Sequence, residues 1–118
     1  MSYLLLIVEP VGQRQARSEK EARHLYQQML DFEEDLKKRG LFLASSSLRP
    51  VAEGLRVRVR EGKRAVIDGP FSEAKEMVGG FFLLDCDSRE QAIAIASECP
   101  AAEWATVEVR ETGPCYLA

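Results

Sequence analysis

The sequence lacks the features that mark disulfide-rich, zinc-binding and membrane-spanning proteins. It has three cysteines and no C-x-x-C spacing, so neither a disulfide framework nor a structural metal site is expected. Cys86 and Cys99 are predicted to fill the core, and Cys115 to lie in the tail. The N-terminal apolar run, residues 4–8, is far shorter than the ~20 residues that cross a bilayer. We therefore predict a cytoplasmic protein with no metal, no cofactor and no membrane partner.

An excess of positive charge is also missing. The chain has sixteen Lys and Arg residues and nineteen Asp and Glu residues, which gives a net charge of −3. No broad basic surface is therefore expected to neutralise the phosphates of a nucleic acid. Nucleic acid is not expected as a partner. A chain of 118 residues with 46% hydrophobic composition is large enough for one core. We expect one domain at residues 1–110 and a short tail at residues 111–118.

The first half of the chain alternates between strand, helix and strand. Residues 3–8 are apolar on both alternating faces, which is typical of a central strand covered on each side. Ser18 and Glu21 form a capping box, and apolar residues then recur at helical spacing until Gly40. Residues 41–48 indicate a second strand.

The second half repeats this order after an insertion. Residues 55–67 alternate apolar and basic side chains around a Glu-Gly turn, which predicts a hairpin. Residues 72–78 have the spacing of a short helix, ended by two glycines. A strand at residues 81–86, a helix after Ser88 and a strand at residues 104–110 complete the pattern. The predicted fold is α+β, a ferredoxin-like βαβ-βαβ arrangement with an inserted hairpin and short helix.

One face of this sheet is expected to lack a cover. Both long helices lie on the other face, and one alternating set of residues 3–8 must face the open side. An uncovered apolar sheet usually marks a partner surface, so we predict a homodimer, a dimeric α+β barrel that encloses a cavity. Alternation along the last strand places Trp104, Glu108 and Arg110 on the enclosed side.

Two stretches carry a family resemblance. DGPFSEAKEMVGGFFLLDCDS, residues 68–88, and CPAAEWATVEVR, residues 99–110, resemble the DGPF branch of the YCII-related proteins, which are small bacterial domains. The similarity extends from Tyr3 to Arg110 and includes RVREGK at residues 58–63. The resemblance implies a dimeric α+β barrel without a settled activity. Some members are small-molecule enzymes, one of them similar to a dehydrochlorinase, and others are linked to extracytoplasmic-function sigma factors.

The enzymes among these relatives depend on a His-Asp pair whose histidine lies in the first helix. This sequence has no histidine at the corresponding position. The family position falls on Met29, counted back from Gly40. The only histidine, His24, lies on the polar stripe of the helix. It is predicted to be a solvated surface residue, so imidazole chemistry is not expected.

The candidate catalytic residues follow the DGPF turn. They are Asp68, Glu73, Lys75 and Glu76, because ionisable groups this close in sequence can shift one another's pKa values. Two structural alternatives remain open. Asp68 can cap the short helix, and the other three can form a solvated charge cluster.

The candidate ligand-binding residues are Arg58, Pro70, Phe71, Trp104, Glu108 and Arg110. Arg58 belongs to a row of three arginines with a spacing of two, which is either an anion clamp or the charged face of an exposed hairpin. Glu108 and Arg110 either bind a ligand or pair at the interface. The serines at residues 45–47 can supply hydroxyl groups to a pocket, although no base for a catalytic serine is evident.

The sequence predicts an uncharacterised YCII-related protein that binds a small polar or anionic molecule in an intersubunit cavity. If it is catalytic, we expect carboxylate-assisted proton transfer of the lyase or isomerase kind, with Arg or Lys stabilising the developing negative charge. The alternative is a non-catalytic regulatory or interaction protein associated with an extracytoplasmic-function sigma factor.

Overall fold

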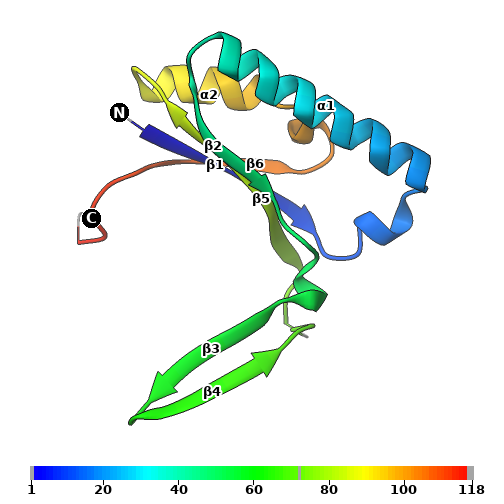
Figure 1. Cartoon of the computed structure of the whole chain (residues 1–118), viewed down its shortest axis with the longest axis vertical. Coiled ribbons are helices and arrows are strands. Elements are labelled where there is room, and N and C mark those ends of the chain that lie inside the picture. The colour runs from blue at the N-terminus through cyan, green and yellow to red at the C-terminus, as the bar shows by residue number, and fades with distance from the viewer. Residues whose placement is uncertain (1, 72, 117–118) are drawn as a thin grey trace.

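The computed structural model describes residues 2–71 and 73–116, which form two separate sheets. The larger sheet is antiparallel, with strand order β2-β5-β1-β6. Its strands are β1 (Ser2–Pro10), β2 (Phe42–Ser47), β5 (Glu76–Asp85) and β6 (Thr106–Glu111). Helices α1 (Glu19–Lys38) and α2 (Arg89–Glu98) both cover one face (Figure 1). The predicted ferredoxin-like α+β fold is confirmed.

Strand β1 shows how the two faces of this sheet differ. Tyr3, Leu5 and Ile7 are buried on the helix-covered side, whereas the residues between them are only half-buried. Leu4 pairs with Leu83 of β5 and Val8 pairs with Val78. Because cross-strand partners share a face, apolar side chains continue across the open side from one strand to the next.

Helix α1 forms as its sequence predicts. The Ser18 hydroxyl accepts a hydrogen bond from the Glu21 amide at 3.1 Å, and Gly40 follows the helix with a φ of +70°, a conformation that glycine adopts without strain. On the inner side, the Phe32 ring meets the Phe82 ring edge-on at 5.2 Å between centroids. Leu36 is fully buried, so this end of the helix is fixed to the sheet.

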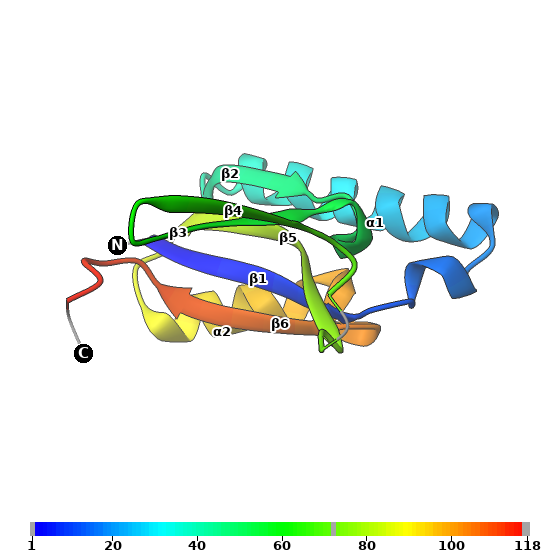
Figure 2. The same ribbon diagram turned by 90° about the horizontal axis from the view of Figure 1, so that it is seen from below.

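The predicted hairpin is confirmed as strands β3 (Leu55–Arg60) and β4 (Lys63–Asp68). Glu61 and Gly62 both have positive φ, as a tight two-residue turn requires. Figures 1 and 2 show this hairpin standing away from the body, on the side of the sheet that carries no helix.

The short helix predicted at residues 72–78 is wrong for the described part of that range; Ser72 lies outside the described residues. Glu76, Met77 and Val78 are the first residues of β5, paired with the last residues of β1. The helical spacing of Glu and Lys is a weak local preference, and pairing with β1 together with burial of Met77 outweighs it. Gly79 and Gly80 therefore lie within a strand.

Trp104 was predicted to lie in the last strand on the side away from the helices, and this placement is also wrong. A short 3₁₀ helix, η3 (Pro100–Glu103), ends at Trp104, and β6 starts only at Thr106. Pro100 at the start of η3 favours this turn. Trp104 instead lies half-buried on the α1 side.

The cysteines lie where the sequence predicted, with Cys86 and Cys99 buried and Cys115 exposed. Burial raises the pKa of both buried thiols above the usual cysteine value. None of the helices in residues 2–71 and 73–116 is long and apolar enough to cross a membrane.

Candidate functional site

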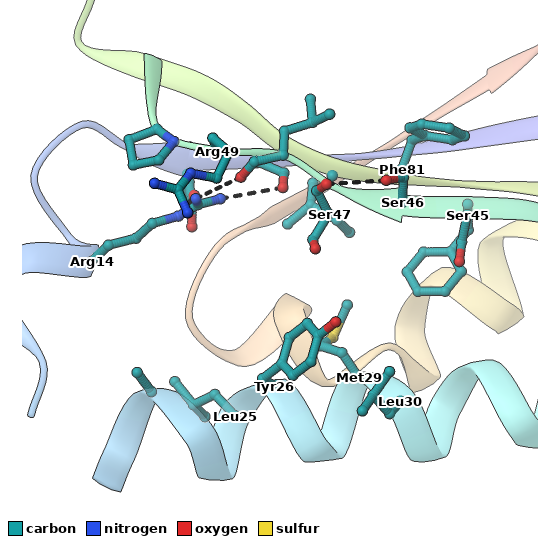
Figure 3. A pocket seen from close by; sticks show the side chains of 18 of the residues that line it. Arg14, Leu25, Tyr26, Met29, Leu30, Ser45, Ser46, Ser47, Arg49 and Phe81 are labelled. Atoms are coloured by element: carbon teal, nitrogen blue, oxygen red, sulfur yellow. Dashed lines mark hydrogen bonds and ion pairs between the residues drawn. The ribbon is translucent and has the colours of Figure 1, made fainter. Parts of the chain in front are cut away.

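A cleft of about 840 Å³ lies between helix α1 and the sheet. Figure 3 shows the α1 side chains pointing toward the strands, with the β2 serines on the opposite wall. The three serines were predicted to supply hydroxyl groups to a pocket, and they do line this cleft. The helix contributes Leu25, Tyr26, Met29 and Leu30, and the strand contributes Ser45, Ser46 and Ser47.

An ion pair with a buried carboxylate lines one end of the cleft. The Glu9 side chain is 2% exposed and accepts a hydrogen bond from Arg14 Nε at 2.6 Å. The remaining guanidinium nitrogens donate to the carbonyls of Leu48, at 2.6 Å, and Gly79, at 3.2 Å. A buried carboxylate is costly without such a partner. Arg14 therefore neutralises Glu9 and also joins β1 to β5 and to the loop after β2.

Gly79 has no side chain, and the Glu9–Arg14 ion pair occupies the space where a Cβ atom would lie. A Cβ atom at this position would lie 2.4 Å from Glu9 Oε1 and 2.8 Å from a terminal nitrogen of Arg14. Both distances are shorter than non-bonded atoms allow, so any larger residue would displace the pair. The first glycine of the Gly-Gly motif is needed for close approach within a strand, and it does not end a helix.

A second carboxylate lies farther along α1. Glu33 accepts a hydrogen bond from the Ser45 hydroxyl, and Lys37 Nζ lies 3.3 Å from its other oxygen. The Ser45 hydrogen bond is the main cause that lowers the Glu33 pKa below its usual value, and Lys37 adds to it, while partial burial opposes both. Glu33 is therefore ionised at neutral pH on the wall of the cleft.

An aromatic ring and a cation meet at the η3 side of the cleft. The Arg17 guanidinium lies over the Trp104 ring, 4.6 Å from its centroid, which is a cation–π arrangement. Gln13 Nε2 donates to the Trp104 carbonyl at 2.7 Å. Among the described residues, buried Trp104 Nε1 has no hydrogen-bond acceptor, and no carboxylate forms an ion pair with Arg17. This part of the cleft therefore presents a cation, while Trp104 Nε1 and Gln13 Oε1 are buried beneath its surface without a partner among the described residues.

The structure brings four of the predicted site residues together at the base of the hairpin, away from the cleft. Arg58, Pro70, Phe71 and Glu73 line a second hollow of about 600 Å³. Its other cation, Arg56, already pairs with Glu73 at 3.0 Å and lies 3.6 Å from the centre of the Phe71 ring. The positive charge of Arg56 is therefore engaged within the protein.

Trp104 lines the cleft, whereas three other predicted site residues lie apart from both hollows. Asp68 faces Leu55 across the hairpin, and Glu76 is paired with Pro10 at the start of β5. The Lys75 carbonyl accepts a hydrogen bond from the Val11 amide at 2.9 Å. Among described residues, Asp68, Lys75 and Glu76 line neither hollow.

Glu108 and Arg110 lie on the open face of the sheet, as predicted. Arg110 Nε is 3.7 Å from Glu108 Oε2, and both side chains are well exposed. The cross-strand partners of these residues are Leu6 and Leu4, so the pair borders the apolar part of that face.

His24 is exposed and lies 3.4 Å from the Gln28 amide nitrogen, as expected for a surface residue. Met29 lines the cleft with a thioether, which cannot transfer protons at neutral pH. Residues 2–71 and 73–116 contain no group of three or more His, Cys, Asp or Glu side chains placed to hold a metal ion.

Residues 1–114 match the family model of the YCII-related domain. The chain belongs to the YCII-related family. This YCII-related chain is 39% identical over 51 residues to uncharacterized protein R00369 of Rhizobium meliloti (strain 1021). That segment covers 43% of the chain and 41% of the relative, so the match spans less than half of each.

A solved structure shares the fold of this YCII-related protein. It is 5-chloro-2-hydroxyhydroquinone dehydrochlorinase (TftG) from Burkholderia phenoliruptrix AC1100, in complex with 2,5-dihydroxybenzoquinone. The alignment covers 96% of this chain and 94% of TftG, with a TM-score of 0.57 and 16% identity. The similarity shows the fold alone.

The cleft residues with the most specific contacts were not predicted. Glu9, Arg14, Arg17 and Glu33 come from different elements, and only the fold brings them together. One signal was available, because the family's histidine position falls on Met29, and Met29 does line the cleft.

Proposed function

We propose that this YCII-related protein binds a small planar anion in the cleft between α1 and the sheet. The observation that supports this most is Arg17 at the η3 side, which lies over the Trp104 ring and forms no ion pair among the described residues. An anionic oxygen bound to its guanidinium would make a charge-assisted hydrogen bond, which is stronger than a neutral one.

The walls of the cleft suit a ring-shaped ligand. Tyr26, Met29 and Leu30 supply apolar surface from α1, and a methionine sulfur makes favourable contacts with rings. A few polar groups among apolar walls are the usual composition of a small-molecule pocket. The ring would lie against α1, with its charged oxygen directed at Arg17.

The ligand class is also supported by the fold relative. TftG was solved with 2,5-dihydroxybenzoquinone, a planar ring with acidic hydroxyl groups. We extend that class of molecule to this chain as part of the proposal. The cleft is favoured over the hairpin base because Arg56 there is already paired with Glu73.

Binding to purified protein tests the proposal. Isothermal titration with 2,5-dihydroxybenzoquinone is expected to give saturable binding, which Arg17→Met weakens at least tenfold, because that variant removes the unpaired cation. Arg58→Met is the matched control, since it removes a cation from the hairpin base. Loss of binding in the control with unchanged binding in Arg17→Met would move the site to the hairpin.

We further propose carboxylate-assisted proton transfer as the chemistry of this cleft. Glu33 is ionised toward the other end of α1 from Arg17, and Lys37 Nζ lies 3.3 Å from its carboxylate. A ligand bound there would give its proton to Glu33, and Lys37 would stabilise the negative charge left on the ligand. In deuterated buffer, the wild type should accelerate deuterium incorporation into an acidic C–H of a bound ligand, and Glu33→Gln should abolish the acceleration while retaining binding. Equal incorporation in both proteins would leave a binding function without catalysis.

We propose that the protein is a homodimer, with the open sheet faces of two copies stacked. Leu4, Leu6 and Val8, with Val78 beside Val8, give that face an apolar surface, and burial of such surface drives association. Sedimentation velocity should show a dimer at micromolar concentration. A monomer under those conditions would overturn this part of the proposal without affecting the cleft, which one copy forms alone.

A second candidate function is a non-catalytic regulatory protein that binds an extracytoplasmic-function sigma factor. The observation in its favour is Met29, which lines the cleft at the position where the family's enzymes have their catalytic histidine. A thioether there cannot transfer protons. Co-elution of the purified chain with a sigma factor encoded beside it would support this function. Separate elution, together with ligand binding, would exclude it.

A further inference from the structure

The β3–β4 hairpin exposes several large apolar side chains to solvent. Five of its large apolar side chains are between 42% and 58% exposed: Leu55, Val57, Val59, Val66 and Ile67. No helix or strand outside the hairpin packs closely against it in the described chain. An isolated two-stranded hairpin is marginally stable in water, so a covering surface is expected.

The strand register places most of the large apolar side chains on one face of the hairpin and most of the charged ones on the other. Val57 faces Val66 across the hairpin, and Arg58 faces Ala65. Since side chains alternate along each strand and cross-strand partners share a face, one face carries Leu55, Val57, Val59 and Val66 with Asp68 and Arg64 at its two ends. The other face carries Arg56, Arg58, Arg60 and Lys63 with Ala65 and Ile67. The hairpin is therefore an amphipathic ribbon, with an apolar cluster of Leu55, Val57, Val59 and Val66 on one face.

The position of the hairpin identifies what could cover that face. Figure 1 shows the hairpin on the side of the sheet that carries no helix, and in Figure 2 it crosses in front of β5. A second copy stacked on the open sheet face would occupy the same side of the molecule. Six residues per strand reach about 20 Å, comparable with the 19 Å shortest extent of the chain, so the hairpin is long enough to lie across a partner.

The charge distribution also favours a copy of the same chain. Residues 55–68 contain five cations and two carboxylates, for a charge of +3, which leaves −6 for the rest of a chain whose total is −3. The hairpin of one copy is thus attracted to the body of another at long range, because opposite net charges steer the encounter of two copies.

We propose that in the homodimer each hairpin clasps the partner copy, with its apolar face packed on the partner and its arginine face toward solvent. This proposal depends on the homodimer proposed above. Burial of Val57, Val59 and Val66 removes apolar surface from water, whereas burial of the arginine face would desolvate charges. The apolar face is therefore the contact surface.

Two neighbouring substitutions test which face makes the contact. Val66→Glu and Ala65→Glu each add one negative charge, at adjacent residues on opposite faces. Val66 is 49% exposed within one chain, so circular dichroism should show both variants folded. By sedimentation equilibrium, Val66→Glu should raise the dimer dissociation constant at least tenfold, whereas Ala65→Glu should stay within threefold of the wild type.

Hydrogen exchange of the wild type gives a second, independent measurement. Amides of β3 and β4 should exchange at least tenfold more slowly at a concentration that favours the dimer than in dilute solution. The clasp would be overturned, and the homodimer left intact, if the wild type dimerises but these amides exchange at the same rate at both concentrations. The same conclusion would follow if both variants dimerise as tightly as the wild type. A wild-type monomer at high micromolar concentration would overturn both.

Discussion

The larger sheet and the hairpin follow the same alternation of side chains but have different surroundings. In the larger sheet, alternate residues such as Leu5 and Leu84 are fully buried beneath the helices. In the hairpin, the same alternation leaves Val57 58% exposed. Alternation therefore assigns side chains to faces, and it does not reveal whether anything covers a face.

The two regions also differ in how they hold an arginine–glutamate pair. Arg14 and Glu9 pair at 2.6 Å with the carboxylate buried, and Arg14 has two further carbonyl acceptors. Arg56 and Glu73 pair at 3.0 Å with both side chains more than half exposed. An exposed pair contributes ~0–1 kcal/mol, whereas loss of one partner of a buried pair costs ~3–5 kcal/mol. Only the first pair is expected to determine the stability of the fold.

Substitution of the two arginines gives the largest expected effect. Arg14→Met should lower the free energy of unfolding by about 3 kcal/mol, because it leaves Glu9 buried without a partner. Arg56→Met should lower it by less than about 1 kcal/mol, since water replaces the lost contact. Urea unfolding of both variants measures the difference. Equal effects would mean that the two pairs are equivalent.

The space at Gly79 gives the next largest effect. Gly79→Ala should destabilise the protein by about 2 kcal/mol, because the new methyl group overlaps the Glu9–Arg14 pair. If that overlap is the cause, the same substitution should cost less when Arg14 is already Met, which a double-mutant cycle measures. Additive effects would instead indicate that the alanine strains the strand itself.

Ser45→Ala tests the charged wall of the cleft and should cost about 1 kcal/mol at neutral pH. Ser45 holds the Glu33 pKa below its usual value, so its stabilising effect is fully present above the unfolded-state pKa and is lost as pH falls through the folded-state pKa. The two proteins should therefore differ most at neutral pH and converge in acid. A gap that is constant with pH would show that Glu33 is not the partner concerned.

The smallest effect is expected in the hairpin. Val59→Ala should change the free energy of unfolding by less than about 0.5 kcal/mol in dilute solution, because Val59 is 57% exposed within one chain. At concentrations that favour the dimer, the cost should rise. A large loss in dilute solution would show that the hairpin is already covered within a single copy.

Local signals in the sequence predicted much of the fold. The Ser18 capping box and the apolar spacing of α1, the Glu61-Gly62 turn and the DGPF motif each depend on residues close together in the chain. Predictions failed where a distant segment decided the conformation. Residues 76–78 joined β1 as a strand, and Pro100 began a turn that moved Trp104 beneath α1.

The sequence by itself determined the family, the order of most elements and the faces on which side chains lie, because periodicity and turn chemistry act over a few residues. Only the tertiary structure decided the composition of the cleft. Glu9 and Arg14 flank a chain reversal, Ser45 and Glu33 lie on different elements, and Gly79 is more than sixty residues from Arg14. Contacts between such distant positions depend on how strands and helices pack, and a local sequence pattern does not predict that packing.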